Sequence, residues 1–427
     1  MESISDKLKR LYFGLAITFF NLVAIFIILN FAAWILIYVW LKLRPEYALP
    51  EYNPVSTYGY KTMAGAYPGW SLQQLSELMT ETWGTPKGQL DWEYDAITQI
   101  QPLPHRGRFV NVAPAGYRLN SRPAPWPPAP GRISIFVFGG STTFGMGLTD
   151  QQTIPSQLQQ LFDQTPAIPP VDVYNFGFSA YTSTQELLLY FKLLRLGLRP
   201  DIVVFIDGLN ECLWYRHGWQ EGDAFAAALR GASHASIAAE LPLLRLVNGI
   251  IGVFKPKQPS RPPVVRQVRE KADAIISRYE TNRALINQLG KCFGTKVLLT
   301  WQPVPMYNYD IKYHFLYKKA VEDSRAFGLR IPLVQAVYPV LEARSRGGLM
   351  GKNFLWLGDI QEGLRENLYV DWVHYNPALS ALIARSIYDY MIYNHWVTDR
   401  SGGSTETRPS RDQACGREGS APGGTGQ

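Results

Sequence analysis

The chain has 427 residues, which is enough for one large domain or two of ordinary size. It is 46% hydrophobic and 13% aromatic, as expected of a folded protein with a sizeable core. The formal net charge is +7, but the basic residues are spread along the chain and form no lysine-rich arm, which disfavours nucleic-acid binding. Three cysteines, Cys212, Cys292 and Cys415, give neither a disulfide framework nor a CxxC metal spacing.

The first predicted element is a membrane anchor at Leu11–Leu41, after a short flank at residues 1–10. The segment contains no charged residue, and about 20 apolar residues suffice to cross a bilayer. It is too long for a signal-peptide core, and no small-residue cleavage site follows it. Trp34, Tyr38 and Trp40 cluster at its C-terminal end, where aromatic side chains favour the headgroup region. Basic residues on both flanks give only a small bias toward an extracytoplasmic remainder of the chain.

Three further regions follow the anchor. Residues 42–131 are rich in Pro, Gly and Tyr and are interpreted as a neck and N-terminal elaboration, with a helix at Ser71–Trp83. Residues 132–397 form the main folded domain. Residues 398–427 are rich in Gly and Ser, cannot bury enough apolar surface to fold, and are predicted to be disordered.

The main domain alternates between short apolar runs and helical stretches. Near-continuous Val, Ile and aromatic runs are typical of strands buried on both faces of a sheet. Such strands are predicted at 133–138, 171–176, 201–206 and 296–301, and helices at Ile154–Phe162, Thr184–Leu196, Lys271–Leu289 and Pro377–Tyr393. The alternation predicts an α/β fold with a doubly wound parallel sheet and right-handed crossovers.

One insertion, residues 215–269, interrupts this alternation. It contains an apolar stretch at 237–254 and then five basic residues with no acidic residue over 255–269. One interpretation is a lid or membrane-facing flap that contacts anionic headgroups or an acidic glycan. The other, which we favour, is a surface excursion whose helix packs on the body of the domain.

A hydroxyl-rich loop follows the first strand of the domain, in FVFGGSTTFGMG (Phe136–Gly147). In open α/β sheets, ligands bind at the C-terminal ends of the strands, which is where this loop lies. A phosphate-binding P-loop would need Lys and Ser/Thr where Met146 and Gly147 stand. The G-x-S-x-G nucleophile elbow would need glycine at Thr143. A helix cap or a serine nucleophile of another kind remains.

A serine nucleophile needs a base, an acid that orients the base, and donors for the oxyanion. Of six histidines, only His374 has an acidic residue, Asp371, three positions earlier. In a tight turn this spacing lets the carboxylate reach Nδ1 while Nε2 faces a substrate. Gly177 and Asn210 follow the next two strands, so that an N–H group and an amide side chain could converge beside Ser141.

In this order, these residues resemble the blocks of the SGNH (GDSL) hydrolase superfamily. The likeness covers about Arg132–Trp396, the insertion excepted. It implies a flavodoxin-like three-layer fold and ester hydrolysis or acyl transfer. The sequence contains no metal-ligand cluster and no nucleotide fingerprint, so we expect no cofactor or metal. The likeness also implies that Ser141 is the nucleophile and that Asp371 and His374 complete a triad. The oxyanion hole would then consist of the N–H groups of Ser141 and Gly177 and the Asn210 side chain.

Two blocks depart from the usual family pattern. The typical G-D-S is Gly139-Gly140-Ser141, and the typical G-x-N-D is Gly208-Leu209-Asn210-Glu211. Neither change removes a residue with a catalytic role in the family. Together with the segments FVNVAPAGYR (109–118) and WQPVP (301–305), the GGST variant is similar to membrane-anchored bacterial members.

The sequence therefore predicts a single-pass membrane-anchored serine esterase of SGNH type with an extracytoplasmic catalytic domain. Such a position suggests an acylated substrate of the envelope, for example an O-acetylated glycan. An O-acyltransferase could use the same residues, because the two reactions differ only in whether water or a hydroxyl group reaches the acyl-enzyme. A non-catalytic, membrane-tethered glycan-binding or scaffold protein is the alternative from another functional class.

Overall fold

The computed structural model of the chain describes residues 4–43, 53–84, 92–166, 168–213, 241–247, 265–317 and 330–397. The chain divides into two compact units. The first comprises Met1–Leu49 and Gly222–Pro259, and the second comprises Pro50–Glu221 and Ser260–Gln427. Most of the insertion and the whole tail predicted from the sequence lie outside the described residues.

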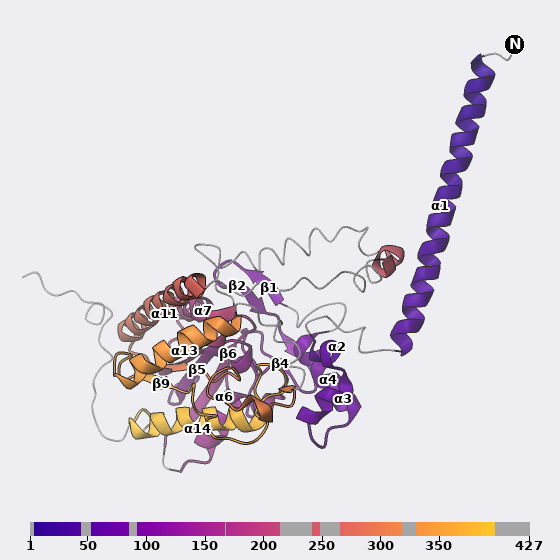
Figure 1. The fold of residues 1–427 in the computed structure, drawn as a ribbon. Coiled ribbons are helices and arrows are strands. Elements are labelled where there is room, and N and C mark those ends of the chain that lie inside the picture. Colours follow the sequence, from indigo (N-terminus) through magenta and orange to yellow (C-terminus); the bar gives the residue numbers. More distant parts are fainter. Residues whose placement is uncertain are drawn as a thin grey trace, which may run out of the picture. The chain divides into compact units, whose positions relative to one another are not determined.

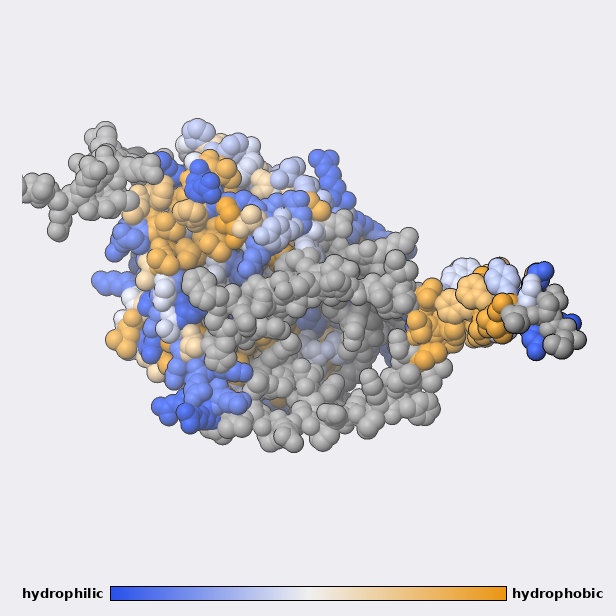
Figure 2. All heavy atoms as spheres, turned by 90° about the horizontal axis from the view of Figure 1, so that it is seen from above, coloured by the Kyte–Doolittle hydropathy of each residue, from blue (hydrophilic) through white to orange (hydrophobic). Residues whose placement is uncertain are grey.

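The first unit is built on one long helix, α1 (Ile4–Leu43). Its stretch Lys7–Leu43 is long and apolar enough to cross a membrane, and most of its surface is hydrophobic (Figure 2). The insertion contributes the described residues 241–247, of which 242–247 are helical. The Leu243 N–H donates to Asn30 Oδ1 of α1 at 3.2 Å, so this part of the insertion contacts the long helix.

The second unit contains a five-stranded parallel sheet with the strand order β6-β5-β7-β8-β9. Its strands are β5 (Ile133–Gly139), β6 (Val171–Gly177), β7 (Ile202–Asp207), β8 (Lys296–Trp301) and β9 (Phe354–Trp356). The first four are the strands predicted from the sequence, and β9 was not predicted. The strand order reverses between β5 and β7, and ligands of doubly wound sheets bind beside such a reversal.

Both faces of this sheet are buried, because alternate side chains of each strand point to opposite sides. On β5, Phe136 and Phe138 pack into one apolar cluster, and Ile135 and Val137 pack into another. Helices α7 (Ser183–Arg195), α11 (Val265–Phe293) and α13 (Arg330–Arg346) cover the first face, and α6 (Ile154–Asp163) and α14 (Pro377–Tyr393) cover the second (Figure 1). The predicted α/β fold with helices on both faces of a parallel sheet is confirmed.

The helix predictions hold with small shifts at their ends. Helix α14 has the predicted bounds, whereas α11 begins six residues before the predicted Lys271 and continues to Phe293. Helix α13 was not predicted. It carries Pro339 in its interior, and proline usually ends or kinks a helix.

The segment before the sheet forms small elements that pack on the domain. They are α2 (Pro54–Tyr58), α3 (Tyr60–Met63), the 3-10 turn η2 (Ala64–Ala66), α4 (Leu72–Trp83) and the strands β1 (Trp92–Asp95), β2 (Gln99–Pro102), β3 (His105–Arg106) and β4 (Asn111–Val112). Helix α4 begins where it was predicted to begin, because Ser71 caps it and forms a capping box with Gln74. The described residues of the second unit also include four short helical elements: α5 (Ser141–Phe144), η3 (Asp150–Gln152), α8 (Leu209–Leu213) and η6 (Ile311–Tyr313).

Candidate active site

Ser141 is the first residue of α5 and follows the last residue of β5, Gly139, by two positions. Its N–H is therefore one of the first-turn donors that have no acceptor within the helix. Gly140, between strand and helix, has to be glycine for a steric reason. A Cβ atom there would clash with the side-chain nitrogen of Asn210. The strand-to-helix turn thus brings the Ser141 and Asn210 side chains into the same small space.

Asp371 and His374 lie in a tight turn just before α14. Asp371 Oδ1 accepts the backbone N–H groups of Val373 and His374 at 2.9 and 2.8 Å, and Oδ2 lies 2.6 Å from His374 Nδ1. Burial alone would raise the pKa of Asp371. The His374 imidazole and the two N–H groups outweigh burial and hold this pKa below its ordinary value. The carboxylate is therefore ionised at neutral pH and fixes the proton of His374 on Nδ1.

The structure brings this turn and the loop that contains Ser141 together. His374 Nε2 lies 2.8 Å from Ser141 Oγ, and with a proton on Nδ1 this nitrogen is an acceptor for the serine hydroxyl. Ser141, His374 and Asp371 thus form a hydrogen-bonded chain in the order that a serine nucleophile, its base and the orienting acid require.

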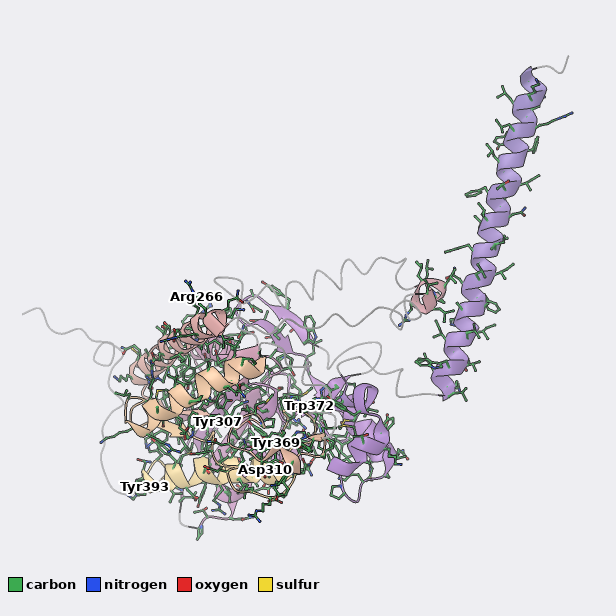
Figure 3. The ribbon with its side chains drawn as sticks, viewed as in Figure 1. Arg266, Tyr307, Asp310, Tyr369, Trp372 and Tyr393 are labelled. Atoms are coloured by element: carbon green, nitrogen blue, oxygen red, sulfur yellow. The ribbon has the colours of Figure 1, made fainter. Side chains whose placement is uncertain are left out.

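Aromatic side chains from the N-terminal elaboration pack against the Asp371–His374 turn. The Trp83 ring contacts the His374 ring edge to face, with centroids 5.7 Å apart. Trp372, labelled in Figure 3, contacts Tyr58 edge to face at 6.3 Å and stacks on the buried His314. Burial lowers the pKa of His314 to about 4, so this second imidazole is neutral and supports the turn as an aromatic ring.

Asn210 lies in α8, directly after β7. Its Nδ2 donates to the carbonyl oxygen of Tyr181 at 2.7 Å. A side-chain amide has two N–H bonds, so the second remains for a ligand. The contact with Tyr181 fixes the orientation of the amide and ties α8 to the segment that follows β6.

Gly177 does not have the surroundings that its predicted role requires. Its N–H donates to Asn175 Oδ1 at 3.0 Å, which leaves no hydrogen for an oxyanion beside Ser141. A Cβ atom at this position would clash with the backbone nitrogen of Phe144. The structure thus corrects the prediction: Gly177 allows α5 to pack closely on the end of β6.

A residue that the sequence analysis missed lies three positions later. Ala180 has φ +63°, in the left-handed region that non-glycine residues rarely adopt. It belongs to the turn closed by the Tyr181 N–H on the Phe178 carbonyl oxygen, and Phe178 itself donates to Gly139 O at 2.9 Å. Within the described residues the Ala180 N–H has no hydrogen-bond acceptor. No signal in the sequence marks this position, since alanine normally disfavours such a conformation.

Three acidic side chains of neighbouring elements are buried: Glu186 on α7, Asp207 at the end of β7 and Glu211 on α8. Glu211 accepts the Ser183 N–H and forms an ion pair with Arg278 at 2.9 Å. Burial raises the pKa values of Glu186 and Asp207 well above the ordinary range, and the charge of Glu211 raises them further. Glu186 and Asp207 therefore hold their protons more tightly than exposed carboxyl groups do, and Glu211 links α8 to α7 and α11 through Ser183 and Arg278.

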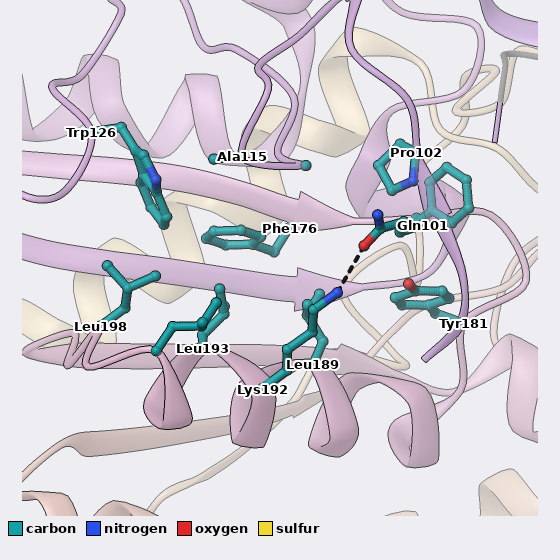
Figure 4. A pocket seen from close by; sticks show the side chains of 13 residues that line it. Gln101, Pro102, Ala115, Trp126, Phe176, Tyr181, Leu189, Lys192, Leu193 and Leu198 are labelled. Carbon is teal, nitrogen blue, oxygen red and sulfur yellow. Dashed lines mark hydrogen bonds between the residues drawn. The ribbon is translucent and has the colours of Figure 1, made fainter. Parts of the chain in front are cut away.

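A mainly apolar cavity of about 160 Å³ lies behind the segment that contains Tyr181 (Figure 4). Its walls include Trp126, Phe176 and Leu193, and its polar part is Lys192, whose Nζ donates to Gln101 Oε1 at 2.8 Å. Ser141 and His374 do not line it. No group of three or more His, Cys, Asp or Glu side chains that could hold a metal ion occurs among the described residues.

Comparison with known proteins identifies the domain that contains Ser141 and Asn210. Residues 137–303 match the GDSL-like lipase/acylhydrolase family. No curated protein matches the chain.

The chain is also similar to solved structures at low sequence identity. The gut microbial diltiazem-metabolizing enzyme BT4096 is 13% identical, with a TM-score of 0.34 over 62% of this chain and 48% of that one, so the chain spans about half of its length. A lipase/acylhydrolase from Enterococcus faecalis is 15% identical, with a TM-score of 0.32 over 61% and 96% of the two chains. The acetylxylan esterase Axe2 from Geobacillus stearothermophilus is 15% identical, with a TM-score of 0.33 over 63% and 97%.

Proposed function

We propose that this chain, an ester-hydrolysing enzyme with a GDSL-like lipase/acylhydrolase domain at residues 137–303, is a membrane-anchored serine esterase in which Ser141 is the nucleophile. The observation that carries the proposal is the hydrogen-bonded chain from Ser141 Oγ through His374 to Asp371, with distances of 2.8 and 2.6 Å. A helix cap needs no histidine at this distance from the serine hydroxyl, so the contact supports a nucleophile.

The mechanism follows from this geometry. Ser141 Oγ attacks the ester carbonyl carbon while its proton passes to His374 Nε2, and Asp371 stabilises the imidazolium that forms. The tetrahedral intermediate collapses, the C–O bond to the alcohol breaks, and the alcohol leaves with the proton from His374. Water then gives a proton to His374 and attacks the acyl-enzyme, which releases the acid and restores Ser141.

The oxyanion would be stabilised by three donors. Among the described residues, neither the Ser141 N–H at the start of α5 nor the second amide N–H of Asn210 has an acceptor. The third donor that we propose is the backbone N–H of Ala180 and not that of Gly177. The Ala180 N–H has no acceptor in the described part of the chain, whereas the Gly177 N–H donates to Asn175. Strained backbone conformations such as that of Ala180 persist where the surrounding structure holds them, and they cluster at active sites.

The substrate proposed is an acylated compound of the cell envelope, for example an O-acetylated glycan, acted on by an extracytoplasmic domain. The apolar length of α1 supports the anchor. The aromatic cluster at its C-terminal end supports a membrane interface near Trp34 and Tyr38. The partly exposed ring of Trp372, two residues before His374, is a surface on which a sugar ring can pack.

The test is hydrolysis of short- and long-chain aryl esters by the full chain in detergent, with Ser141→Ala and the control Ser386→Ala. Ser386 lies on α14 and only bonds its own helix. We expect turnover by the wild type and Ser386→Ala and none above background by Ser141→Ala. Turnover that survives Ser141→Ala would refute the proposal. Acyl transfer to an added oligosaccharide in preference to water would instead identify an acyltransferase.

A further inference from the structure

The helix that carries Ser141 is too short to maintain its own position. Helix α5 has four residues, and an isolated helical turn is unstable in water because nucleation costs more than a single hydrogen bond returns. Its last carbonyl groups also lack hydrogen-bond donors within the helix. The position of Ser141 Oγ relative to His374 Nε2 therefore depends on contacts from elsewhere in the chain.

Several of those contacts come from one buried arginine, Arg118, in the segment FVNVAPAGYR; Asn175 and Gln302 each add a hydrogen bond to α5. The Arg118 side chain is fully buried. Nη1 donates to the carbonyl oxygens of Phe144 and Gly145 at 2.9 and 2.8 Å, and Nη2 donates to Leu148 O at 2.6 Å. The guanidinium carbon also lies 4.9 Å from the centre of the Phe144 ring. One guanidinium thus binds the C-terminal end of α5, where a positive charge is favourable, and the chain that leaves it.

A buried acid holds the guanidinium in place. Arg118 Nε donates to Asp150 Oδ1 at 2.8 Å, and Asp150 also accepts the backbone and side-chain N–H groups of Asn111. Burial lowers the pKa of Arg118, and the Asp150 carboxylate opposes this effect. Because buried charges must be paired, removal of either partner leaves the other uncompensated.

The backbone of the same residue reaches the neighbouring strand. Arg118 N–H donates to Asn175 O at 2.9 Å. The Asn175 side chain in turn donates to Thr143 O at 3.0 Å and accepts from Gly177 N–H. The segment at Arg118 therefore connects the nucleophile helix to the end of β6, from which the Ala180 turn departs.

We propose that Arg118, oriented by Asp150, is a positioning residue that sets the distance between Ser141 and His374. It touches neither the reacting atoms nor the triad and acts through the carbonyl groups of Phe144 and Gly145. Lysine cannot replace it, because an ammonium group lacks the planar fork that reaches these carbonyl groups and Asp150 at once. The proposal rests on the function of Ser141 proposed above.

The test compares Arg118→Lys with the control Arg122→Lys in the full chain. Arg122 is partly exposed and pairs with Asp163 and Asp172, and none of its hydrogen bonds within the described residues reaches α5. A displacement of about 1 Å costs on the order of 100-fold in rate. For Arg118→Lys we expect losses of this order in kcat for an aryl ester and in the rate at which a fluorophosphonate labels Ser141. KM should change less than about threefold, since the ester-binding surface is kept. Arg122→Lys should match the wild type in both rates.

Stability must be measured with activity, because Arg118 is buried. Asp150→Asn is the second variant: it keeps the guanidinium but removes the charge that orients it, and we expect a smaller loss of kcat at unchanged KM. If the activity loss of either variant equals its unfolded fraction, or if a folded Arg118→Lys retains wild-type rates, the positioning role is refuted. Failure of the wild type itself to react at Ser141 would instead refute the proposed function.

Discussion

Replacement of Asp371 by asparagine would change one oxygen of the triad into an NH2 group and keep the shape of the side chain. In the structure, Asp371 Oδ1 accepts two backbone N–H groups, from Val373 and His374, and Oδ2 faces His374 Nδ1. The amide oxygen of asparagine can satisfy the two backbone donors only in the place of Oδ1. The NH2 group must then face Nδ1, which becomes an acceptor and loses its proton to Nε2.

This change of tautomer determines how large a loss of kcat we expect. A protonated Nε2 cannot take the proton of Ser141 Oγ, although the two atoms stay within hydrogen-bond distance. The corresponding exchange in a serine protease triad lowers kcat about 10⁴-fold at unchanged geometry. That loss corresponds to about 5.5 kcal/mol in the activation free energy. We expect a loss of this order for Asp371→Asn, with little change in KM.

The assay is steady-state hydrolysis of an aryl acetate at neutral pH, together with thermal unfolding. Asp389→Asn, on the exposed side of α14, is the matched control for the loss of one negative charge. It should retain wild-type kcat. If a folded Asp371→Asn variant keeps kcat within tenfold of the wild type, the carboxylate does not fix the tautomer of His374 and the reasoning is wrong.

Three further predictions follow from the geometry. Asn210→Ala should lower kcat by about 10²–10³, or 2.7–4 kcal/mol, because it removes an oxyanion donor; a loss below tenfold in the same ester assay would exclude that role. Ala180→Gly should raise the free energy of unfolding by about 1 kcal/mol in denaturant unfolding, because glycine adopts φ +63° without the steric cost of a Cβ atom. The variant keeps the backbone N–H, so kcat should stay within threefold of the wild type. Destabilisation would contradict the assigned backbone strain. Burial raises the pKa of Glu186 in the folded state, so the folded chain binds this proton more tightly than the unfolded chain and loses stability as pH rises above about 4.3. Glu186→Gln should therefore have a higher Tm than the wild type at pH 8 but not at pH 4, and parallel Tm curves would contradict this.

The sequence predicted those parts of the fold and site that depend on local pattern. The four long strands are continuous apolar runs, and Ser141 and Asn210 follow strand ends that a parallel sheet brings to one edge. Asp371 and His374 are three residues apart, and a single turn suffices to join them. Strand β9 has only three residues and α13 contains an internal proline, so neither has a clear period in the sequence.

What the sequence did not reveal depends on contacts between distant segments. Gly177 was assigned to the oxyanion hole by its place at a strand end and by the family resemblance, but its N–H donates to Asn175 and its missing side chain makes room for α5. Ala180 carries no residue-type signal for a left-handed backbone. Arg118 is an ordinary arginine in the sequence, and only the fold brings it to Phe144 and Asp150, 26 and 32 residues away.

The central claim is that Ser141 is the residue that becomes covalently acylated. Its most direct test is mass spectrometry of the full chain after reaction with a fluorophosphonate, in which Oγ bonds to phosphorus and fluoride leaves. We expect a single adduct on the peptide that contains Ser141 and no adduct in His374→Ala, which lacks the base. An adduct on another residue, or undiminished labelling without His374, would contradict it.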